Sequence, residues 1–309
     1  MRNGRTLCFA LAAALAACTE ARTDARAQAA DTRAGAQEGW RQVEAALGRP
    51  GAPQPYGVMR FSFPRTDLRV TVDGVQIRPA LALGSWLAFQ RVRAGGAMVM
   101  GDLVLAEDEV APVMLRLQQG GVSQTALHNH LLRESPRVMY MHVEAHGDPV
   151  RIAREVRAAL ALTRTPLDPP PAAPAPAPAI DLDTAAVARA LGHSGRVNGG
   201  VYQVSVSRPI PVRMGDQLVP PAMGVATAIN FQPTGGGRAA VTGDFVLADH
   251  EVNAVIRALR AGGIEVTALH SHLLGEQPRL YFMHFWANDD AVKLARGLGT
   301  ALKAMAVRG

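Results

Sequence analysis

The sequence predicts an α+β protein made of two tandem copies of one module, each with an antiparallel sheet and two helices. The first observation is a repeat: residues 101–110 recur as residues 243–252, a shift of 243 − 101 = 142, and His142 recurs as His284 at the same shift. The second is a change of hydrophobic period within each copy, from alternation to helical spacing and back. A period this long that occurs only twice indicates a domain duplication and not a solenoid.

Each module begins with alternating apolar residues and turn signals, which predict a β-meander. The predicted strands cover residues 58–63, 68–72 and 86–92 in the first copy and 200–206 and 225–231 in the second. The rest of the module is predicted to have the order β-α-β-β-α, with both helices on one face of the sheet.

The first helix of each copy carries an apolar stripe at positions i, i+3, i+4 and i+7. The residues in the stripe are Val110, Val113, Met114 and Leu117, repeated as Val252, Val255, Ile256 and Leu259. Both runs end in a Gly-Gly pair, as helix C-termini often do. In the first copy, strands over residues 122–132 and 137–145 and a helix over residues 149–162 are predicted to follow.

Composition divides the chain into five segments. They are a signal peptide with a lipobox (1–18), a flexible tether (19–38), the first module (39–164), a Pro/Ala-rich linker (165–180) and the second module (181–309). The linker is expected to be semi-extended because its closely spaced prolines favour polyproline II. The two modules could pack together as a pseudo-dimer.

The first segment is typical of an export signal. Arg2 and Arg5 precede an apolar run over residues 7–17 that is too short to span a bilayer. The run ends in Leu15-Ala16-Ala17-Cys18, which looks like a lipobox. Acylated Cys18 is therefore expected to anchor the protein in membrane lipid, facing the periplasm or the outer surface. The alternative is cleavage after residues 25–27, which leaves a soluble periplasmic or secreted protein.

Composition argues against two classes of function. The net charge of +6 comes from scattered arginines, and only 5% of residues are aromatic, whereas a nucleic-acid reader clusters both. The two cysteines, Cys8 and Cys18, both precede the folded part, which therefore has no disulfide or thiolate chemistry.

Histidines stand at equivalent positions in the two copies. Residues two apart in a strand share a face, so His128 and His130 point the same way, and His142, Glu144 and His146 share one side of the next strand. With a hairpin centred near residue 136, His130 is predicted opposite His142 and His128 opposite Glu144. The other side of the second strand is apolar and would cover the helices, so the histidine face is predicted to be the open one.

Neutral imidazoles beside a carboxylate suit zinc or another divalent transition metal, and they also suit acid–base chemistry near neutral pH. The predicted metal ligands are His128, His130, His142 and His146. An enzyme built on this face would use Glu144 or Glu134 as its base. The alternative is that the imidazoles only hydrogen-bond to loops and hold no metal.

The second copy presents a different ligand face, formed by His270, His272, His284 and Trp286. Trp286 stands where the first copy has Glu144, and Asn288 stands where it has His146. The second face therefore has fewer metal ligands and an added aromatic ring. If either copy binds metal, the first is favoured.

Two arginines, Arg137 and Arg279, are candidates for binding an anionic ligand at the mouth of the histidine face. The alternative is that they pair with Glu134 and Glu276 and shape the turns.

Four longer motifs stand out: Ala80-Leu-Ala-Leu-Gly-Ser-Trp86, Met100-Gly-Asp-Leu-Val-Leu105, Thr125-Ala-Leu-His-Asn-His-Leu-Leu132 and Asn230-Phe-Gln-Pro-Thr-Gly-Gly-Gly237. These motifs resemble the LppY/LpqO family of bacterial lipoproteins, and the match covers residues 40–305. The resemblance implies export and lipidation. It transfers no catalytic residues, because the family is a domain of unknown function.

A weaker similarity is to the first cupin motif. Gly121 is followed after six residues by His128-x-His130 and then by Glu134, and the pattern recurs in the second copy. Cupins usually have five residues after that glycine, and the helix before it fits a β-barrel poorly, so a bicupin is the minority fold.

Asp102 and Asp244 follow glycines at strand-like positions and are interpreted as turn residues or as acids that support metal ligands. The absence of Gly-x-Ser-x-Gly and His-Glu-x-x-His disfavours elbow-type serine hydrolases and the common zinc peptidases. Three hypotheses remain: a lipid-anchored envelope protein that binds a ligand or divalent metal on its histidine face, a metal-dependent hydrolase or isomerase, and a scaffold without metal.

Overall fold

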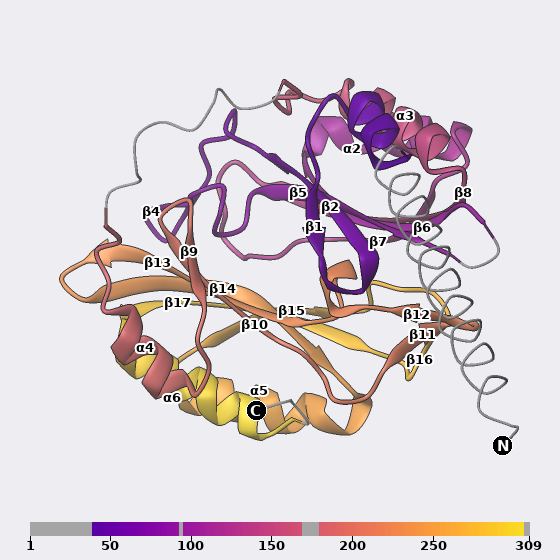
Figure 1. Ribbon diagram of the computed structural model, residues 1–309. Coiled ribbons are helices and arrows are strands. Elements are labelled where there is room, and N and C mark those ends of the chain that lie inside the picture. Colours follow the sequence, from indigo (N-terminus) through magenta and orange to yellow (C-terminus); the bar gives the residue numbers. More distant parts are fainter. Residues whose placement is uncertain (1–38, 93–94, 169–178, 306–309) are drawn as a thin grey trace, which may run out of the picture.

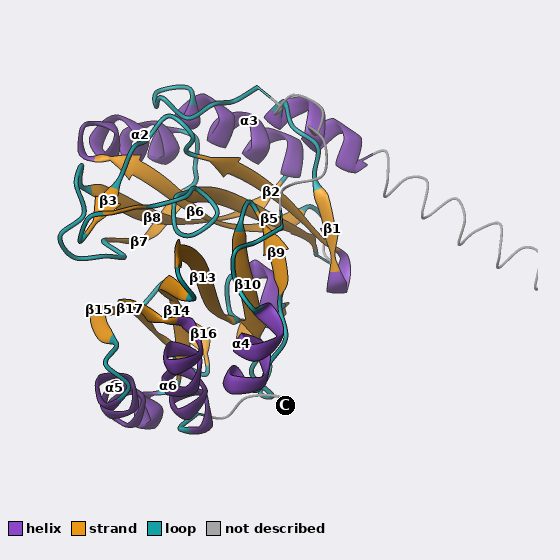
Figure 2. Cartoon of the chain, turned by 90° about the vertical axis from the view of Figure 1, so that its left-hand side faces the viewer, coloured by secondary structure: helices purple, strands orange, loops and turns teal. Residues whose placement is uncertain are grey.

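The computed structural model describes residues 39–92, 95–168 and 179–305. It contains two modules, each with a six-stranded antiparallel sheet. The sheets oppose each other through one face, and helices cover the other face of each, so the helices form the two outer layers (Figure 1, Figure 2). The predicted mixed class with antiparallel sheets is confirmed. The predicted signal peptide with Cys18, the tether and residues 169–178 of the linker lie outside the described residues.

The sheet of the first module has the strand order β1-β2-β5-β6-β8-β7. Helical backbone over residues 39–47 precedes it. The elements are β1 (Ala52–Gln54), β2 (Val58–Pro64), β5 (Gly84–Arg91), β6 (Ala97–Ala106), α2 (Glu107–Gln119), β7 (Ser123–His128), β8 (Val138–Gly147) and α3 (Pro149–Leu160).

The second module repeats this arrangement with the order β9-β10-β13-β14-β17-β15. Its elements are α4 (Thr184–Leu191), β9 (Arg196–Asn198), β10 (Val201–Val206), β13 (Thr227–Gly235), β14 (Arg238–Leu247), α5 (Val252–Ala261), β15 (Glu265–His270), β17 (Tyr281–Asp290) and α6 (Ala291–Lys303).

The helices α2 and α5 are the two amphipathic helices that the sequence predicts. Val113 and Leu117 on α2, and Val255 and Leu259 on α5, are fully buried in the core between helices and sheet. Burying side chains of this size contributes roughly 1.5–3 kcal/mol each. These contacts hold the helices on one face of each sheet and leave the other face free to pack against the opposite module.

An arginine–glutamate pair ties each sheet to the start of its helix. Arg65 donates to Glu109 and Arg208 donates to Glu251, both at 2.7 Å. Each guanidinium also donates to a backbone carbonyl of β6 or β14. All four side chains are buried, so the loss of either partner of a pair would be costly in the interior.

Each module extends an arm across the other. The first arm, residues 66–83, contains the hairpin of β3 (Thr71–Val72) and β4 (Val75–Gln76). The second arm, residues 209–225, contains the hairpin of β11 (Val212–Met214) and β12 (Gln217–Val219), which pairs further with β16 (Glu276–Gln277).

The arms build two cores that contain residues from both modules. Leu81 and Ile77 of the first arm are buried with Val201 and Trp286 of the second module. The second arm does the same in the opposite direction, with Met223 and Val225 buried among residues that include Val58, Ala88 and Met98 of the first module. The two sheets are therefore fixed face to face by exchanged apolar segments.

The hairpin of the predicted histidine face differs from the expectation. β7 ends at His128, and its register with β8 places His128 opposite Tyr140 and Ala126 opposite His142. The predicted pairings of His130 with His142 and of His128 with Glu144 are therefore wrong. A register shift between Gln124 and Ala126 displaces the strand, and the chain then leaves the sheet so that Ser135 bridges Thr71 on the arm.

Neither sheet closes into a barrel. In the first module β1 and β7 are the edges of an open sheet, and β9 and β15 are the edges in the second. The bicupin alternative is therefore wrong, because a cupin requires closure. Among the described residues, no helix is long and apolar enough to cross a membrane.

Candidate metal centre

An aspartate and a histidine face each other on neighbouring strands of each sheet. Asp102 on β6 lies opposite His142 on β8, and Asp244 on β14 lies opposite His284 on β17. Side chains directly opposite in an antiparallel pair share one face, so each pair points toward the other module. The sheets thus bring two equivalent Asp/His pairs to the interface.

Six histidines meet between the modules. The shortest contacts between histidine rings cross the interface, with centroid distances of 3.6 Å for His128–His270, 3.8 Å for His130–His284 and 3.6 Å for His142–His272. His128 and His270 are equivalent in the repeat, and the other two contacts exchange under the same equivalence. The cluster therefore has an approximate twofold axis that passes between His128 and His270.

Polar atoms in this cluster are buried without hydrogen-bond partners. They are Nε2 of His128, His130, His142 and His284, together with one carboxylate oxygen each of Asp102 and Asp244. A buried polar atom left unpaired costs about 1–3 kcal/mol. Such a concentration of unpaired atoms at one place indicates a site that is completed by something other than protein.

Hydrogen bonds define the tautomer of two of these rings. Nδ1 of His128 lies 3.0 Å from the carbonyl of Asn129, and Nδ1 of His284 lies 2.8 Å from the carbonyl of Gly243. A carbonyl only accepts, so Nδ1 carries the hydrogen in both rings and Nε2 keeps its lone pair. Metal-binding histidines are commonly held in this way by a hydrogen bond from the second nitrogen.

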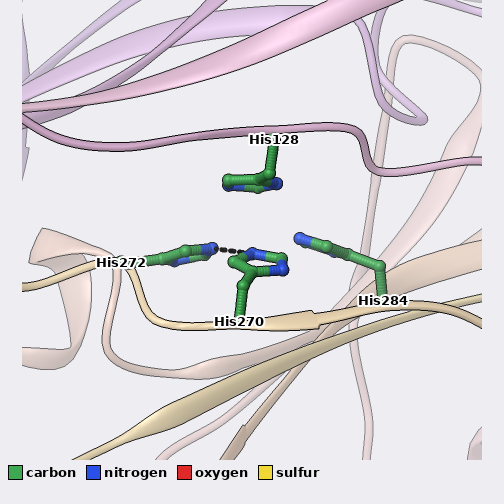
Figure 3. A group of neighbouring side chains, drawn as sticks. All are labelled: His128, His270, His272 and His284. Atoms are coloured by element: carbon green, nitrogen blue, oxygen red, sulfur yellow. Dashed lines mark hydrogen bonds between the residues drawn. The ribbon is translucent and has the colours of Figure 1, made fainter.

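Two overlapping groups of histidines are compact enough to hold a metal. One consists of His128 with His270, His272 and His284, and the other of His128 with His130 and His142. Within each group the possible ligand atoms lie within 4.8 Å of one another. Figure 3 shows the first group, with His128 reaching from the first module toward three histidines of the second.

The surroundings keep these imidazoles neutral. Burial lowers the pKa of His128 to about 4 and that of His270 to about 3, and it holds the pKa of the other four well below the usual value. The neutral imidazole is the form that binds metal. Burial also raises the pKa of Asp102 to about 8, and that of Asp244 is raised by burial and by Asp102.

A cleft of about 1450 Å³ between the modules leads to this cluster. Both aspartates and four of the histidines lie on its wall: Asp102, Asp244, His130, His142, His272 and His284. Most ligand pockets enclose roughly 300–1,000 Å³, so the cleft has room for a small organic molecule.

Several predicted site residues lie outside the cluster. His146 is half exposed and contacts Glu144 at 3.0 Å, and neither belongs to the two groups. Glu134, the other candidate base, accepts a hydrogen bond from the backbone of Val138. Trp286 donates to Asp73 on the first arm. It therefore stabilises the interface between the modules.

The two candidate anion sites are also elsewhere. Arg137 is exposed, and its nearest carboxylate is that of Glu107 at 3.9 Å. Arg279 contacts Glu276 at 3.3 Å, which agrees with the turn-shaping alternative.

The expectation that the histidine face is open is wrong, because the second module covers it. His142 and His284 are 6% and 1% exposed. One signal in the sequence could have revealed this: residues 97–106 are almost all apolar, and every residue of β6 is buried. An apolar run without alternation is typical of a strand covered on both faces. The compact histidine groups are divided between the copies: the larger takes three of its four histidines from the second copy, and the smaller lies entirely in the first.

Comparisons with known proteins give one clear assignment. No curated protein matches the chain significantly. A solved structure of a trimeric bacterial microcompartment shell protein, PduB, is similar over 82% of this chain and 90% of that chain, with 12% identity and a TM-score of 0.21, a value too low to support any inference. A family model described as Domain of Unknown Function (DUF1259) matches residues 41–162 and again residues 185–304. These matches span both modules, so the chain belongs to this family as a tandem repeat of its domain.

Proposed function

We propose that the protein binds a divalent first-row transition metal, such as zinc, between its two modules. The observation that carries this proposal is the pair of buried Nε2 atoms of His128 and His284, which have no partner and whose lone pairs are fixed by the carbonyl contacts of Nδ1. Coordination removes the cost of leaving these acceptors unpaired. His128 belongs to the first module and His284 to the second, so the metal would connect the modules.

The donor set fits this chemistry. Imidazole nitrogen suits zinc, copper, iron and nickel, whereas magnesium and calcium prefer oxygen. The ligand atoms of the four-histidine group lie within 4.8 Å of one another, and small side-chain rotations would bring them to the separation of roughly 3.4 Å expected around tetrahedral zinc. Asp244 lies 3.7 Å from Nδ1 of His272, in position to orient that ring.

Metal analysis of the full-length protein, purified without a histidine tag, tests the proposal. We expect about one metal ion per chain, and loss of that ion in His128→Ala and in His284→Ala, because each removes a ligand. His250→Ala is the matched control, since His250 is exposed and lies outside both groups. Absence of stoichiometric metal from the wild type would support the scaffold alternative.

We also propose that the protein is exported and anchored to membrane lipid through Cys18. The support is the apolar run and lipobox at residues 7–18 and the resemblance to the LppY/LpqO lipoproteins. Labelling cells with a radioactive fatty acid tests the anchor: the wild type is expected to incorporate label and Cys18→Ala is not. Label on both, or on neither, would contradict the anchor.

A second candidate function is metal-dependent hydrolysis or isomerisation. The observation that favours it is the cleft, which gives a small molecule access to Asp102, Asp244 and four histidines. Glu144 and Glu134 do not line this cleft, so the acid–base residues of such an enzyme would be the two aspartates. Turnover that depends on both the metal and Asp102 would distinguish catalysis from binding alone.

A further inference from the structure

Arg60 is a positive charge that the protein leaves largely unused on the wall of the cleft. It lies on β2, and its guanidinium stacks over the ring of Trp86, with Cζ 4.0 Å from the ring centroid. Within the described part of the chain, it makes a hydrogen bond from Nη1 to the carbonyl of Ala222 at 2.9 Å. A guanidinium has five N–H donors, so most of them remain available to a molecule in the cleft.

Buried arginines of this chain are satisfied either by carboxylates, as Arg65 and Arg208 are, or by several backbone carbonyls, as Arg49 is. Arg65 contacts both Asp67 and Glu109, and Arg208 contacts Glu251, each at 2.7 Å. Arg60 differs: among the described residues, no carboxylate lies within ion-pair distance of its guanidinium. A partly buried cation without a counter-charge in contact raises the free energy of the folded protein, and an anionic ligand would supply that charge.

The repeat shows that holding the arm does not require this charge. Arg60 pairs with Ala88 across β2 and β5, and Gln203 pairs with Asn230 at the equivalent place in the second module. Gln203 donates to the carbonyl of Ala80 on the first arm at 2.7 Å, which is the counterpart of the bond from Arg60 to Ala222. A neutral amide performs the same structural task, so the charge of Arg60 serves a different purpose.

A second arginine approaches the same part of the cleft. Arg196 on β9 lines the cleft and is exposed, and it lowers the pKa of Arg60 through charge repulsion. Burial is the largest cause, nearby Asp102 raises the pKa in part, and the resulting pKa is about 10, so Arg60 remains charged at neutral pH. Burial raises the pKa of Asp102 itself to about 8, so this carboxyl group is mostly protonated at neutral pH and supplies little counter-charge. Two positive side chains that line the same cleft, with no described carboxylate in ion-pair contact with Arg60, form a binding site for an anion.

We propose that the cleft binds a small organic anion and that Arg60 holds its oxyanion group, a carboxylate or a phosphate, with Arg196 at the rim. A planar guanidinium suits both groups because it can donate two parallel hydrogen bonds. The cleft continues to the histidine cluster, so a ligand anchored on Arg60 can extend toward it. This site needs no metal, and it stands on residues that are not metal ligands.

Isothermal titration calorimetry on the full-length protein tests the site, with inorganic phosphate and succinate as the probes for the two oxyanions. Each titration is run on metal-free and on metal-loaded protein. We expect at least one probe to bind both forms, and Arg60→Gln to weaken that binding by roughly 10-fold or more, because a charged hydrogen-bond donor is lost. Binding of phosphate but not succinate, or the reverse, identifies the oxyanion.

Matched variants separate charge from folding. Arg60→Gln installs the amide that the second module uses at the equivalent position, so we expect it to fold with an unchanged melting temperature. Arg60→Lys keeps the charge and is expected to retain measurable binding even if the amide variant is unstable. Arg91→Gln is the control, because Arg91 also stacks on a tryptophan, Trp40, but does not line the cleft.

Three results would overturn the proposal. One is that neither probe binds the wild type. Another is that folded Arg60→Gln binds the probe as tightly as Arg91→Gln does or, where Arg60→Gln does not fold, that folded Arg60→Lys binds no probe. The last is probe binding that requires metal and is unchanged by Arg60→Gln. This result would place the anion on the metal, and the metal proposal would remain intact.

Discussion

Ser85 in the first module and Thr227 in the second occupy equivalent positions, and each hydroxyl accepts a hydrogen bond from a backbone N–H of the next strand, at 2.8 and 3.0 Å. One residue further along, the equivalence ends: Trp86 lines the cleft in the first module, and Ala228 stands there in the second. The arginine–glutamate pair and the three clustered histidines are likewise present in both modules. Arg60, in contrast, is replaced by Gln203 at the equivalent position of the second module. The modules share the residues that hold the fold and the cluster, and they differ where the cleft would meet a ligand.

The largest expected effect separates two equivalent histidines. His272 belongs to the four-histidine group and His130 does not. His272→Ala is expected to weaken metal binding by more than the roughly 10–100-fold typical of losing a supporting residue, and His130→Ala by no more than that. Competition with a chelator of known affinity measures both. Equal losses would mean that each module holds its own metal.

The next effect concerns the buried ion pairs. Arg208→Met leaves Glu251 buried beside an apolar side chain and is expected to lower the free energy of unfolding by about 3–5 kcal/mol. Arg65→Met is expected to have a smaller effect, because Glu109 keeps Arg164, whose Nε lies 3.6 Å from its carboxylate. Urea unfolding monitored by circular dichroism gives both values. A change under about 1 kcal/mol in either variant would show that the pairs are not needed for stability.

A smaller effect depends on pH and is common to both modules. In the metal-free protein the imidazoles stay neutral when folded, with a pKa of about 4 for His128 and about 3 for His270, but unfolded histidine titrates near 6.5. The unfolded chain therefore binds more protons below pH 6.5, and stability falls as the pH drops from 6.5 toward 4.

The aspartates oppose this trend. Asp102 keeps its proton up to about pH 8 when folded, against 3.8 in the ordinary state, so it adds stability as the pH falls through that range. Six imidazoles outnumber two carboxyl groups, so the net expectation is a lower melting temperature at pH 5 than at pH 7 for the chelated protein. A melting temperature that rises on acidification would contradict the burial of the neutral histidines.

The smallest effect makes the first module resemble the second. Tyr140 stacks on His130 and donates to the carbonyl of Ala82 at 3.1 Å, whereas the equivalent Phe282 stacks on His272 and has no hydroxyl. Tyr140→Phe is expected to cost about 0.5–1.5 kcal/mol of unfolding free energy and to leave the metal content unchanged. Loss of metal in this variant would mean that the hydroxyl, and not only the ring, positions His130.

The class of fold and the repeat follow from local patterns in the sequence. Val113 and Leu117 lie at helical spacing, and α2 and α5 form where that spacing predicts them. The residue types of the cluster are also visible, since all six histidines stand in short motifs that occur twice. The spacing of apolar residues and the residue types of a motif are properties of a single segment, so they can be recognised without a structure.

The assembly of the site depends on contacts between segments far apart in the chain. The ring contact of His128 with His270 spans the repeat, and no spacing within one module encodes it. The loop that follows the register shift at Gln124 and Ala126 bridges to the arm at Thr71, a segment much earlier in the chain. For the same reason Asp102 could be noticed as a supporting acid but not placed beside His142.

The approximate twofold axis between His128 and His270 has a consequence for how the cleft can be specialised. Two separate copies of one module, joined as a homodimer, would have to present identical side chains on both walls, so an arginine on one would appear on the other. Joining the copies in one chain removes that obligation. Arg60 and Trp86 can then occupy one wall while Gln203 and Ala228 occupy the other, and a ligand without symmetry of its own can be held in a single orientation.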